Sequence, residues 1–459
     1  MLGVSLTECK IIIVAGTRPE VIKLSSVIQG LSRRNFDFIF IWSGQHYDYE
    51  MSKIFFDELN LPEPDYDLDV RSGSHAEQTS RTMVKLERVL KDIGKSIVVA
   101  EGDTNTVLAS ALVCAKTDNL FAHVEAGLRS YDRSMPEEIN RIVAGAIASV
   151  HFAPTVRAAL NLLYEGVPPY KAFITGNTIV DVVLKCKDTA LSKGGKLLKE
   201  LGLKEREYAL VTVHRAENVD IKSRLREILS ALSLISKDTP LVFPIHPRTK
   251  KRVEEFGLKD YLKDLAIVKP LGYFEFLGLL TNSLFAITDS GGVQEECLTL
   301  CVPCITVRYN TERPETVEAG INFLTGPERD RIIRTVDHVI EKNHEIRNRV
   351  AGMLNPLGDG RAGKRIADIL TKIAEEGWQN YIPDFRETGE PTYRLISGTN
   401  FEGSTISEFH ERFKGIFIIL IYDRGNPLIP YSDTIIRSRY SLRVFGPELL
   451  IRKYFRQYL

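Results

Sequence analysis

Short, continuous apolar runs alternate with helix-length segments along most of this chain, and this pattern restricts the fold more than any other feature. Eight such runs span residues 10–15, 38–42, 97–100, 120–124, 209–213, 241–245, 266–268 and 284–288. Runs without polar alternation are typical of parallel strands that are covered on both faces by helices. The pattern therefore predicts an α/β protein with two doubly wound domains, one before and one after about Gly176.

Composition narrows the possible partners. The chain has 459 residues, enough for about three domains, and its 44% hydrophobic and 26% charged residues exclude a disordered or fibrous chain. Lys and Arg together number 60, as do Asp and Glu, so charge gives no reason to expect nucleic acid or an anionic membrane as a partner.

The longest apolar run, 416–421, is too short to span a bilayer, and the start of the chain lacks a signal-peptide pattern. We expect a cytoplasmic protein.

The six cysteines are too few for a disulfide framework in a chain of this length. Cys297, Cys301 and Cys304 have a spacing that can bind an iron–sulfur cluster. Their spacers are apolar, however, and residues 305–307 resemble a strand. The sequence favours a helix that ends before a buried strand, with cysteines as small apolar residues, and we expect no metal site.

The pattern changes after about Glu376. Residues 377–394 contain Pro383, Gly389 and Pro391 and are predicted to form a linker. Residues 395–459 are predicted to form a small α+β module, with a helix at 404–413, strands at 415–422 and 441–445, and a tight turn at 423–426. Two strands are too few for a large core, so we expect pairing with a second copy of the chain.

The first predicted strand leads into a loop, 16–20, that contains Arg18 and is followed by Lys23. Pro19 suits a first helical turn, so the loop brings two cations to a helix N-terminus, a suitable seat for phosphate. The loop is not a Walker A motif. Ordinary surface basic residues are an equally good interpretation of this segment alone.

Three carboxylates lie close to strand ends in the first half. Asp103 follows strand 97–100, although it could simply cap the next helix. Glu125 directly follows strand 120–124, and Glu137 has Arg141 four residues later, which could be an ordinary helix pair. Carboxylates on opposite sides of one carbon can remove a proton from one face and return it to the other. The set therefore predicts acid–base chemistry.

The second half has motifs suited to a nucleotide. His214 follows strand 209–213, and Ser290-Gly291-Gly292 follow strand 284–288. Paired glycines at a helix start let a diphosphate approach backbone N–H groups. Glu296, one turn into that helix, can accept hydrogen bonds from ribose hydroxyls, and Arg313 adds a further cation. Helix capping by the Ser-Gly-Gly segment is the alternative.

These motifs occur in the order seen in the non-hydrolysing UDP-N-acetylglucosamine 2-epimerases, which the chain resembles over about residues 10–370. The resemblance implies the GT-B fold, with two Rossmann-like domains and an active site in the cleft between them. It assigns residues 1–176 to the first domain, completed by a returning helix at 360–376, and residues 177–359 to a UDP-binding domain.

The resemblance also implies a role for each matching residue. Asp103, Glu125 and Glu137 would surround the sugar C2, with His214 close to the leaving diphosphate. The expected substrate-binding residues are Arg18, Lys23, Arg141, Pro270, Phe276, Ser290, Gly291, Gly292, Glu296 and Arg313, with the segment 270–276 at the uracil. One departure is Glu101, where many relatives have His.

The implied reaction interconverts UDP-GlcNAc and UDP-ManNAc, an isomerisation that supplies UDP-ManNAc for cell-surface polysaccharide or glycoprotein glycans. UDP is eliminated to give an enzyme-bound 2-acetamidoglucal and is then added back, and no cofactor such as NAD is required. Three alternatives remain open: a hydrolysing epimerase that releases ManNAc and UDP, a GT-B glycosyltransferase, and a catalytically silent UDP-sugar-binding regulator.

Two further resemblances concern regulation. Gln45 and His46 match part of the site where bacterial relatives bind a second substrate molecule as an activator, whereas residues 71–78 are similar to archaeal relatives. The C-terminal segment resembles RCK-C (TrkA-C) domains, although residues 439–442 replace the usual Gly-Asp. This module implies a small anionic ligand or a role in a homodimer. We expect a chain truncated near Glu376 to keep its epimerase activity.

Overall fold

The computed structural model describes residues 9–44, 56–377 and 391–455. The chain divides into two compact units, Met1–Asp181 with Gly358–Leu459, and Val182–Leu357. Gln45 and His46 lie outside the described residues, as does most of the predicted linker. Among the described residues, no helix is both long and apolar enough to cross a membrane.

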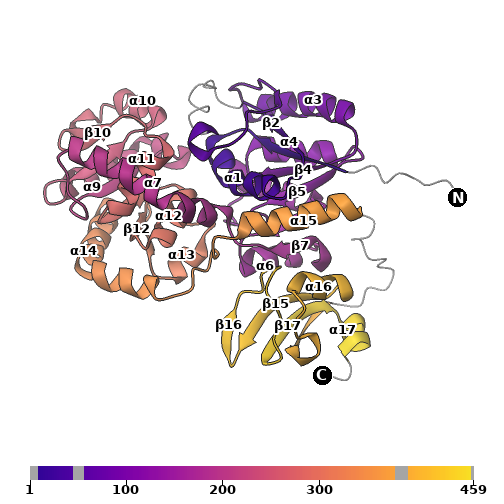
Figure 1. Cartoon of the computed structure of the whole chain (residues 1–459). Helices are drawn as coiled ribbons and strands as arrows, with labels where there is room; N and C mark the ends of the chain where they lie inside the picture. Colours follow the sequence, from indigo (N-terminus) through magenta and orange to yellow (C-terminus); the bar gives the residue numbers. More distant parts are fainter. Residues whose placement is uncertain (1–8, 45–55, 378–390, 456–459) are drawn as a thin grey trace. The chain divides into compact units, whose positions relative to one another are not determined.

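The first unit contains a seven-stranded parallel sheet in the order β3-β2-β1-β4-β5-β6-β7 (Figure 1). The strands are β1 (Lys10–Ala15), β2 (Phe38–Trp42), β3 (Tyr66–Asp67), β4 (Ser96–Glu101), β5 (Leu120–Val124), β6 (Val150–Ala153) and β7 (Ala172–Ile174). Four of them match the predicted runs. Strands β3, β6 and β7, which have two, four and three residues, were not predicted.

Helices cover both faces of this sheet. One face packs on α1 (Arg18–Ser32) and α15 (Ala362–Glu376), which lie side by side (Figure 1). The other face packs on α3 (His75–Ile93), α4 (Asn105–Cys114) and α5 (Pro136–Ile147). The almost fully buried Ile and Val side chains of β1 and β4 explain why these strands are continuous apolar runs.

The second unit has a six-stranded parallel sheet in the order β10-β9-β8-β11-β12-β13, the strand order of a Rossmann-like domain. The strands are β8 (Ala209–Thr212), β9 (Leu241–Pro244), β10 (Ala266–Val268), β11 (Phe285–Thr288), β12 (Cys304–Thr306) and β13 (Asn322–Leu324). The main helices are α7 (Thr178–Glu200), α9 (Lys222–Ile235), α10 (Pro247–Glu255), α11 (Tyr273–Asn282), α12 (Gly291–Leu300) and α14 (Arg329–Ala351). The predicted α/β class with two doubly wound domains is confirmed.

Cys297, Cys301 and Cys304 lie where a helix ends and a buried strand begins. Helix α12 ends at Leu300, Cys301 adopts a left-handed conformation, and Cys304 begins the buried strand β12. All six cysteines are free thiols. Among the described residues, no group of three or more His, Cys, Asp or Glu side chains is placed to hold a metal ion.

The C-terminal module is a four-stranded antiparallel sheet in the order β14-β17-β15-β16. Its elements are β14 (Pro391–Ser397), α16 (Ile406–Arg412), β15 (Phe417–Asp423), β16 (Asn426–Leu428), β17 (Tyr440–Pro447) and α17 (Glu448–Phe455). The predicted helix, both predicted strands and the turn at Arg424-Gly425 are present. Residues 391–394 pair with β17 and are therefore strand, not linker as predicted, because an edge strand tolerates the proline.

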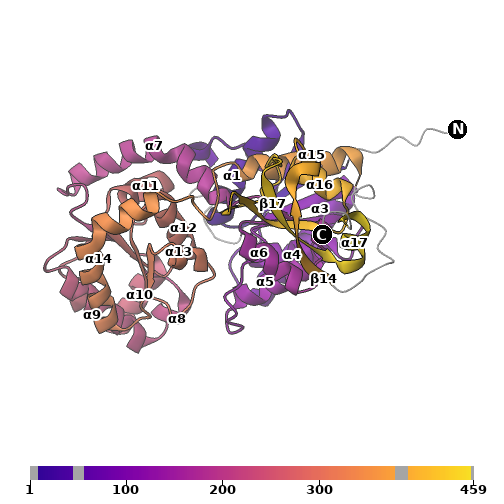
Figure 2. The same cartoon turned by 90° about the horizontal axis from the view of Figure 1, so that it is seen from below.

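One face of the module's sheet is buried under the module's own helices, and part of the other face is buried against the α/β part of the first unit. Ile418, Ile421 and Val444 pack under the module's own helices. Phe417, Ile419 and Phe445 instead join an apolar cluster that includes α6 (Val156–Tyr164), and β15 lies beside this helix (Figure 1). Figure 2 shows the module's β14, β17, α16 and α17 from below. The apolar strands are thus buried within one chain. The expectation that they need a second copy to bury them is not supported.

Candidate functional site

The carboxyl ends of β1, β4 and β5 are neighbours in the sheet of the first unit. Asp103 follows β4 and Glu125 directly follows β5. Ligands of open α/β sheets bind at this edge, outside the carboxyl ends of the strands. The topology therefore brings together side chains that are 22 residues apart in the sequence.

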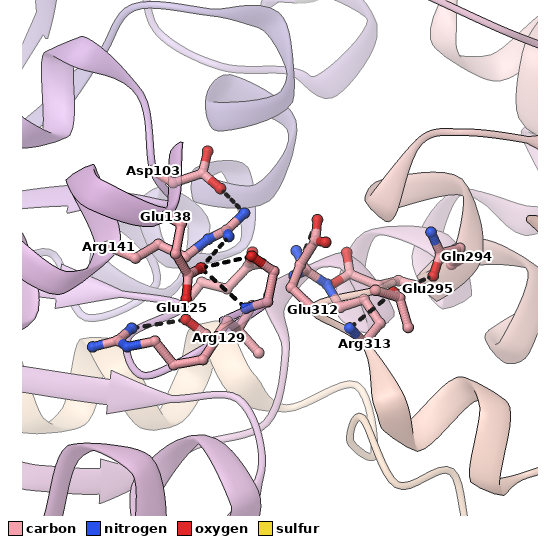
Figure 3. A network of polar contacts seen from close by, with 12 residues as sticks. Asp103, Glu125, Arg129, Glu138, Arg141, Gln294, Glu295, Glu312 and Arg313 are labelled. Carbon is pink, nitrogen blue, oxygen red and sulfur yellow. Dashed lines mark hydrogen bonds and ion pairs between the residues drawn. The ribbon is translucent and has the colours of Figure 1, made fainter. Parts of the chain in front are cut away.

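Asp103 does not cap the next helix. The cap of α4 is Thr104, whose hydroxyl accepts the Val107 N–H. The Asp103 carboxylate instead contacts the guanidinium of Arg141 on α5 (Figure 3). Asn140, the preceding residue on α5, donates to the backbone oxygen of Asp103 across 2.8 Å. Two side chains of α5 thus hold Asp103, one through its backbone and one through its carboxylate, and the side chain remains one-quarter exposed.

Glu125 has a left-handed backbone, with φ of 64°, which is costly for a residue with a side chain. Its carboxylate contacts the ammonium of Lys23 on α1. The amide of Asn177 donates to the same oxygen across 3.4 Å. Lys23 is buried, so in this structure it neutralises a carboxylate rather than presenting an exposed cation.

The start of α5 carries two glutamates with different roles. Glu138 is fully buried and accepts hydrogen bonds from the Ser130 and Tyr131 N–H groups. It also accepts from Arg141 Nη1 across 2.8 Å. Glu138 therefore holds the 128–132 loop and the arginine that orients Asp103. Glu137 is half-buried at the first turn of α5.

The loop between β1 and α1 is closed by its own carboxylate. Glu20 Oε2 accepts the N–H groups of Gly16 and Thr17 across 2.8 and 2.6 Å. Glu20 Oε1 accepts from the Thr104 hydroxyl across 2.6 Å. These backbone donors are therefore already used, which weakens the predicted phosphate seat at this helix N-terminus. Arg18 stands at the first position of α1 and is half-buried.

In the second unit, the buried carboxylate of Asp289 organises the edge of the sheet. It follows β11 and accepts the backbone N–H groups of His214 and Arg215, at 2.9 to 3.1 Å, together with the side-chain amide of Asn218. His214 Nε2 lies 4.0 Å from Asp289 Oδ1. The segment after β8 is thereby fixed, with the imidazole of His214 38% exposed.

The predicted diphosphate segment forms the N-terminus of α12, with Ser290 at the N-cap position. A side chain at Gly291 would lie 2.7 Å from the carboxylate of Glu312, which explains the glycine there. A side chain at Gly292 would meet nothing closer than the Ser290 hydroxyl at 3.9 Å. The open surroundings of Gly292 leave this helix N-terminus accessible to an anion.

Arg313 and Glu296 are buried in the same unit. The guanidinium of Arg313 contacts the fully buried carboxylate of Glu295 (Figure 3). Burial raises the pKa of the Tyr273 hydroxyl well above its usual range, and the neighbouring Glu296 adds to the shift. Pro270 is exposed in the loop before α11, whereas Phe276 packs against the core of the unit.

Several residues that build these sites were not predicted. Glu20, Glu138, Asn140 and Asn177 all hold a predicted site residue or its loop. Glu138 had a signal, because it adjoins Glu137 and precedes Arg141 by three residues. Asn177 had none, since its partner Glu125 is 52 residues away in the sequence.

Comparisons with known proteins agree with this arrangement. The family described as UDP-N-acetylglucosamine 2-epimerase matches residues 29–371. The UDP-N-acetylglucosamine 2-epimerase of Methanocaldococcus jannaschii is 48% identical, with 79% of this chain and 99% of that protein covered. The UDP-2,3-diacetamido-2,3-dideoxy-D-glucuronate 2-epimerase of Pseudomonas aeruginosa is 38% identical, over 79% of this chain and all of that protein.

The fold comparison gives the same result. The crystal structure of the M. jannaschii enzyme in complex with UDP-GlcNAc and UDP has a TM-score of 0.73 at 48% identity. The match covers 79% of this chain and 99% of that one.

Proposed function

The chain belongs to the UDP-N-acetylglucosamine 2-epimerase family, and we propose that it interconverts UDP-GlcNAc and UDP-ManNAc without releasing the sugar. One observation carries the proposal beyond family membership. Asp103 and Glu125 follow neighbouring strands, and each contacts a buried cation from a different helix, Arg141 or Lys23. Two carboxylates in fixed and distinct surroundings suit proton transfer at one carbon.

The chemistry explains why a nucleotide-binding unit accompanies these carboxylates. The sugar C2–H stands beside an amide nitrogen rather than a carbonyl, so a carboxylate alone cannot remove its proton at a useful rate. The C1–O bond to UDP must break before or with that step, and the charge that develops on the diphosphate must be stabilised. The accessible N-terminus of α12 and the cation Arg18 are the groups we assign to this task.

The proposed cycle needs no external oxidant or reductant. One carboxylate takes the C2 proton as UDP leaves, which gives the 2-acetamidoglucal. A second carboxyl returns a proton to the other face of C2, and UDP adds back to C1. Asp103, Glu125 and Glu137 are the proposed acid–base groups, with His214 near the leaving diphosphate. Glu296 is assigned to the ribose and the 270–276 segment to the uracil.

Incubation with UDP-GlcNAc in deuterium oxide tests this function. An epimerase returns both UDP-sugars labelled at C2, as read by NMR and mass spectrometry. A hydrolysing enzyme releases free ManNAc and UDP. A glycosyltransferase or a silent regulator leaves C2 unlabelled, and either result would refute the proposal. The same assay with UDP-2,3-diacetamido-sugars tests the preference suggested by the P. aeruginosa relative.

The C-terminal module extends beyond the part shared with relatives, which cover 79% of this chain. We assign it an RCK-C-like fold and a small anionic ligand, with the enzyme acting as a cytoplasmic homodimer. Arg439, one of the module's basic residues, is neutralised by two hydrogen bonds of 2.7 Å to Asp423. Calorimetry with nucleotides and inorganic phosphate tests the ligand, and light scattering tests the dimer.

A further inference from the structure

Glu101 is the last residue of β4, and its carboxyl is buried beside Lys23 and Glu125. Lys23 Nζ lies 3.2 Å from Glu101 Oε1 and also contacts Glu125 Oε2. The side chains of Lys23, Glu101 and Glu125 are 8%, 3% and 5% exposed. One ammonium thus serves two adjacent carboxyls that water barely reaches.

This arrangement requires a proton. Both carboxyls contact the same ammonium, and a single positive charge balances only one of them. With both ionised, the group would also leave an uncompensated negative charge in a buried place, which is strongly unfavourable. With one proton, the two carboxyls and the ammonium are neutral together.

The groups around Glu101 favour the same state. Burial raises the pKa of Glu101 well above its usual range. The positive charge of Lys23 lowers this pKa, whereas the negative charges of Glu125 and Glu20 raise it further. Glu20 reaches the group from α1, and Asn177 contributes a neutral amide to Glu125. His123 on β5 is uncharged at neutral pH, because burial lowers its pKa to about 4. Lys23 is the cation that both carboxyls contact.

We propose that Glu101 and Glu125 hold one proton between them, and that this shared proton is delivered to C2 of the unsaturated sugar when UDP adds back. The inference rests on the proposed epimerase function. Beside Lys23 alone, Glu125 would be held ionised at neutral pH and could not act as an acid. Glu101 supplies the second negative charge that offsets Lys23, so it is a positioning residue that acts through Glu125.

The step balances. Glu125 gives its proton to C2, and the electron pair of the C1–C2 double bond forms the new C–H bond. A lone pair of a UDP phosphate oxygen then forms the bond to C1. The two carboxylates beside Lys23 recover one proton from water before the next turnover. The proton removed from C2 in the first half reaction leaves through another carboxylate to water.

The variant Glu101→Gln tests the proposal, because it keeps the size of the side chain and removes its charge. Without the charge of residue 101, Glu125 should lose its proton at a lower pH. The decline of kcat on the alkaline side of its pH profile should therefore begin at a lower pH. At about pH 8, kcat should fall at least about tenfold with KM little changed. Lys23→Met should move the alkaline decline of kcat to a higher pH. Opposite shifts in the two variants are not expected if Glu101 and Lys23 only support the structure.

Infrared spectroscopy provides a readout that does not depend on activity. At about pH 8, resting wild-type enzyme should show a carboxylic-acid C=O band that Glu101→Gln and Glu125→Gln both lose. Asp181→Asn is the matched control, since Asp181 is a partly buried carboxyl whose pKa is raised by desolvation to about 6. Asp181 lies outside the group formed by Lys23, Glu101 and Glu125. The Asp181→Asn variant should therefore keep the carboxylic-acid C=O band and the alkaline limb of the kcat profile at its wild-type pH.

The outcomes are distinct. A wild-type enzyme without the band, or a Glu101→Gln variant with the band and limb unchanged, overturns the proposal. If Glu101→Gln does not fold, Glu125→Gln and Lys23→Met decide it by the same band. An enzyme that does not exchange C2 hydrogen with solvent refutes the proposed function instead, while the band still reports whether the shared proton exists.

Discussion

The guanidinium of Arg365 on α15 donates a 2.6 Å hydrogen bond to the carboxylate of Asp433 in the C-terminal module. The same guanidinium donates to the Thr175 backbone oxygen across 2.9 Å and lies 3.9 Å over the ring of Tyr431. It also makes two hydrogen bonds of 2.7 Å to Asp359. Arg365 is 2% exposed. Within the first unit, the module is thus joined to the α/β part through a buried cation as well as through apolar contacts.

We predict that Asp433→Asn lowers the free energy of unfolding by about 1.5–3 kcal/mol, the usual range for a hydrogen bond to a charged group. The effect should be limited, because Asp359 still pairs with Arg365. Denaturant unfolding measures it. The matched control is Asp423→Asn, which removes an Arg–Asp pair on the exposed side of the same module. That change should cost clearly less, because exposed ion pairs contribute little to stability; equal losses would contradict the role given to Arg365.

Removal of the module after Glu376 should destabilise the remaining chain. Sequence alone predicts retained activity, because the family resemblance ends near residue 370. The structure indicates otherwise, since Phe417, Ile419 and Phe445 cover an apolar surface that includes α6. Gly127, two residues after Glu125, is held against the Ala158 backbone of this helix. Exposure of α6 should therefore also loosen the loop that carries Glu125.

Thermal unfolding, binding of a hydrophobic dye and turnover of the truncated chain measure these effects. We expect a lower Tm, more dye binding and a reduced kcat. Val156→Thr with Leu160→Gln, which makes the exposed face of α6 more polar, should recover solubility but not the full kcat. A truncated chain with unchanged Tm and kcat would show that the contacts with α6 do not matter, and would favour the expectation from sequence.

The strands that position the site were predictable, but the contacts that tune it were not. Strands β1 and β5 have the predicted bounds, because a strand buried on both faces is apolar throughout. Residues 391–394 of the edge strand β14 were predicted to be linker, because their partners in β17 lie 50 to 56 residues away in the sequence. Likewise, only the fold brings Lys23 to Glu101 and Glu125. Local patterns carry no information about such distant pairs.

Loss of the acid–base groups should reduce turnover with little effect on nucleotide binding. Asp103→Asn, Glu125→Gln and Glu137→Gln should each lower kcat by about 10²-fold or more, because each removes a group that gives or takes a proton. Steady-state kinetics and UDP titration separate the two effects. Glu87→Gln, on the outer face of α3, is the control and should not change either quantity. Normal turnover in all three variants would sink the assignment.

Arg18→Ala should weaken UDP binding by about 1.5–3 kcal/mol, the range for a charge-assisted hydrogen bond to phosphate. The side chain stands at the start of α1, beside backbone donors already occupied by Glu20. The guanidinium is therefore the group of that loop that we expect to reach the diphosphate. Calorimetry measures the change, with Arg88→Ala on α3 as control. Unchanged UDP affinity would remove this loop from the nucleotide site.

His410 gives the C-terminal module a dependence on pH. Its ring stacks on Phe417, and Nε2 accepts the Ile418 N–H across 3.0 Å. Burial lowers the pKa of His410 to about 3, from an ordinary value of about 6.5. Between these values the unfolded chain binds a proton that the folded chain does not. Stability is therefore lost as pH falls below about 6.5, by about 1.4 kcal/mol for each pH unit.

His410→Gln should remove this dependence, because the Gln oxygen can accept the Ile418 N–H but does not titrate. Between about pH 7.5 and pH 5, the unfolding free energy of wild type should fall by about 2 kcal/mol more than that of the variant. Other buried groups with shifted pKa values, such as His151 and Glu20, are present in both proteins and cancel in this difference. Denaturant unfolding at several pH values measures it. Parallel stability curves for the two proteins would show that His410 is protonated in the folded module, contrary to its burial beside Phe417.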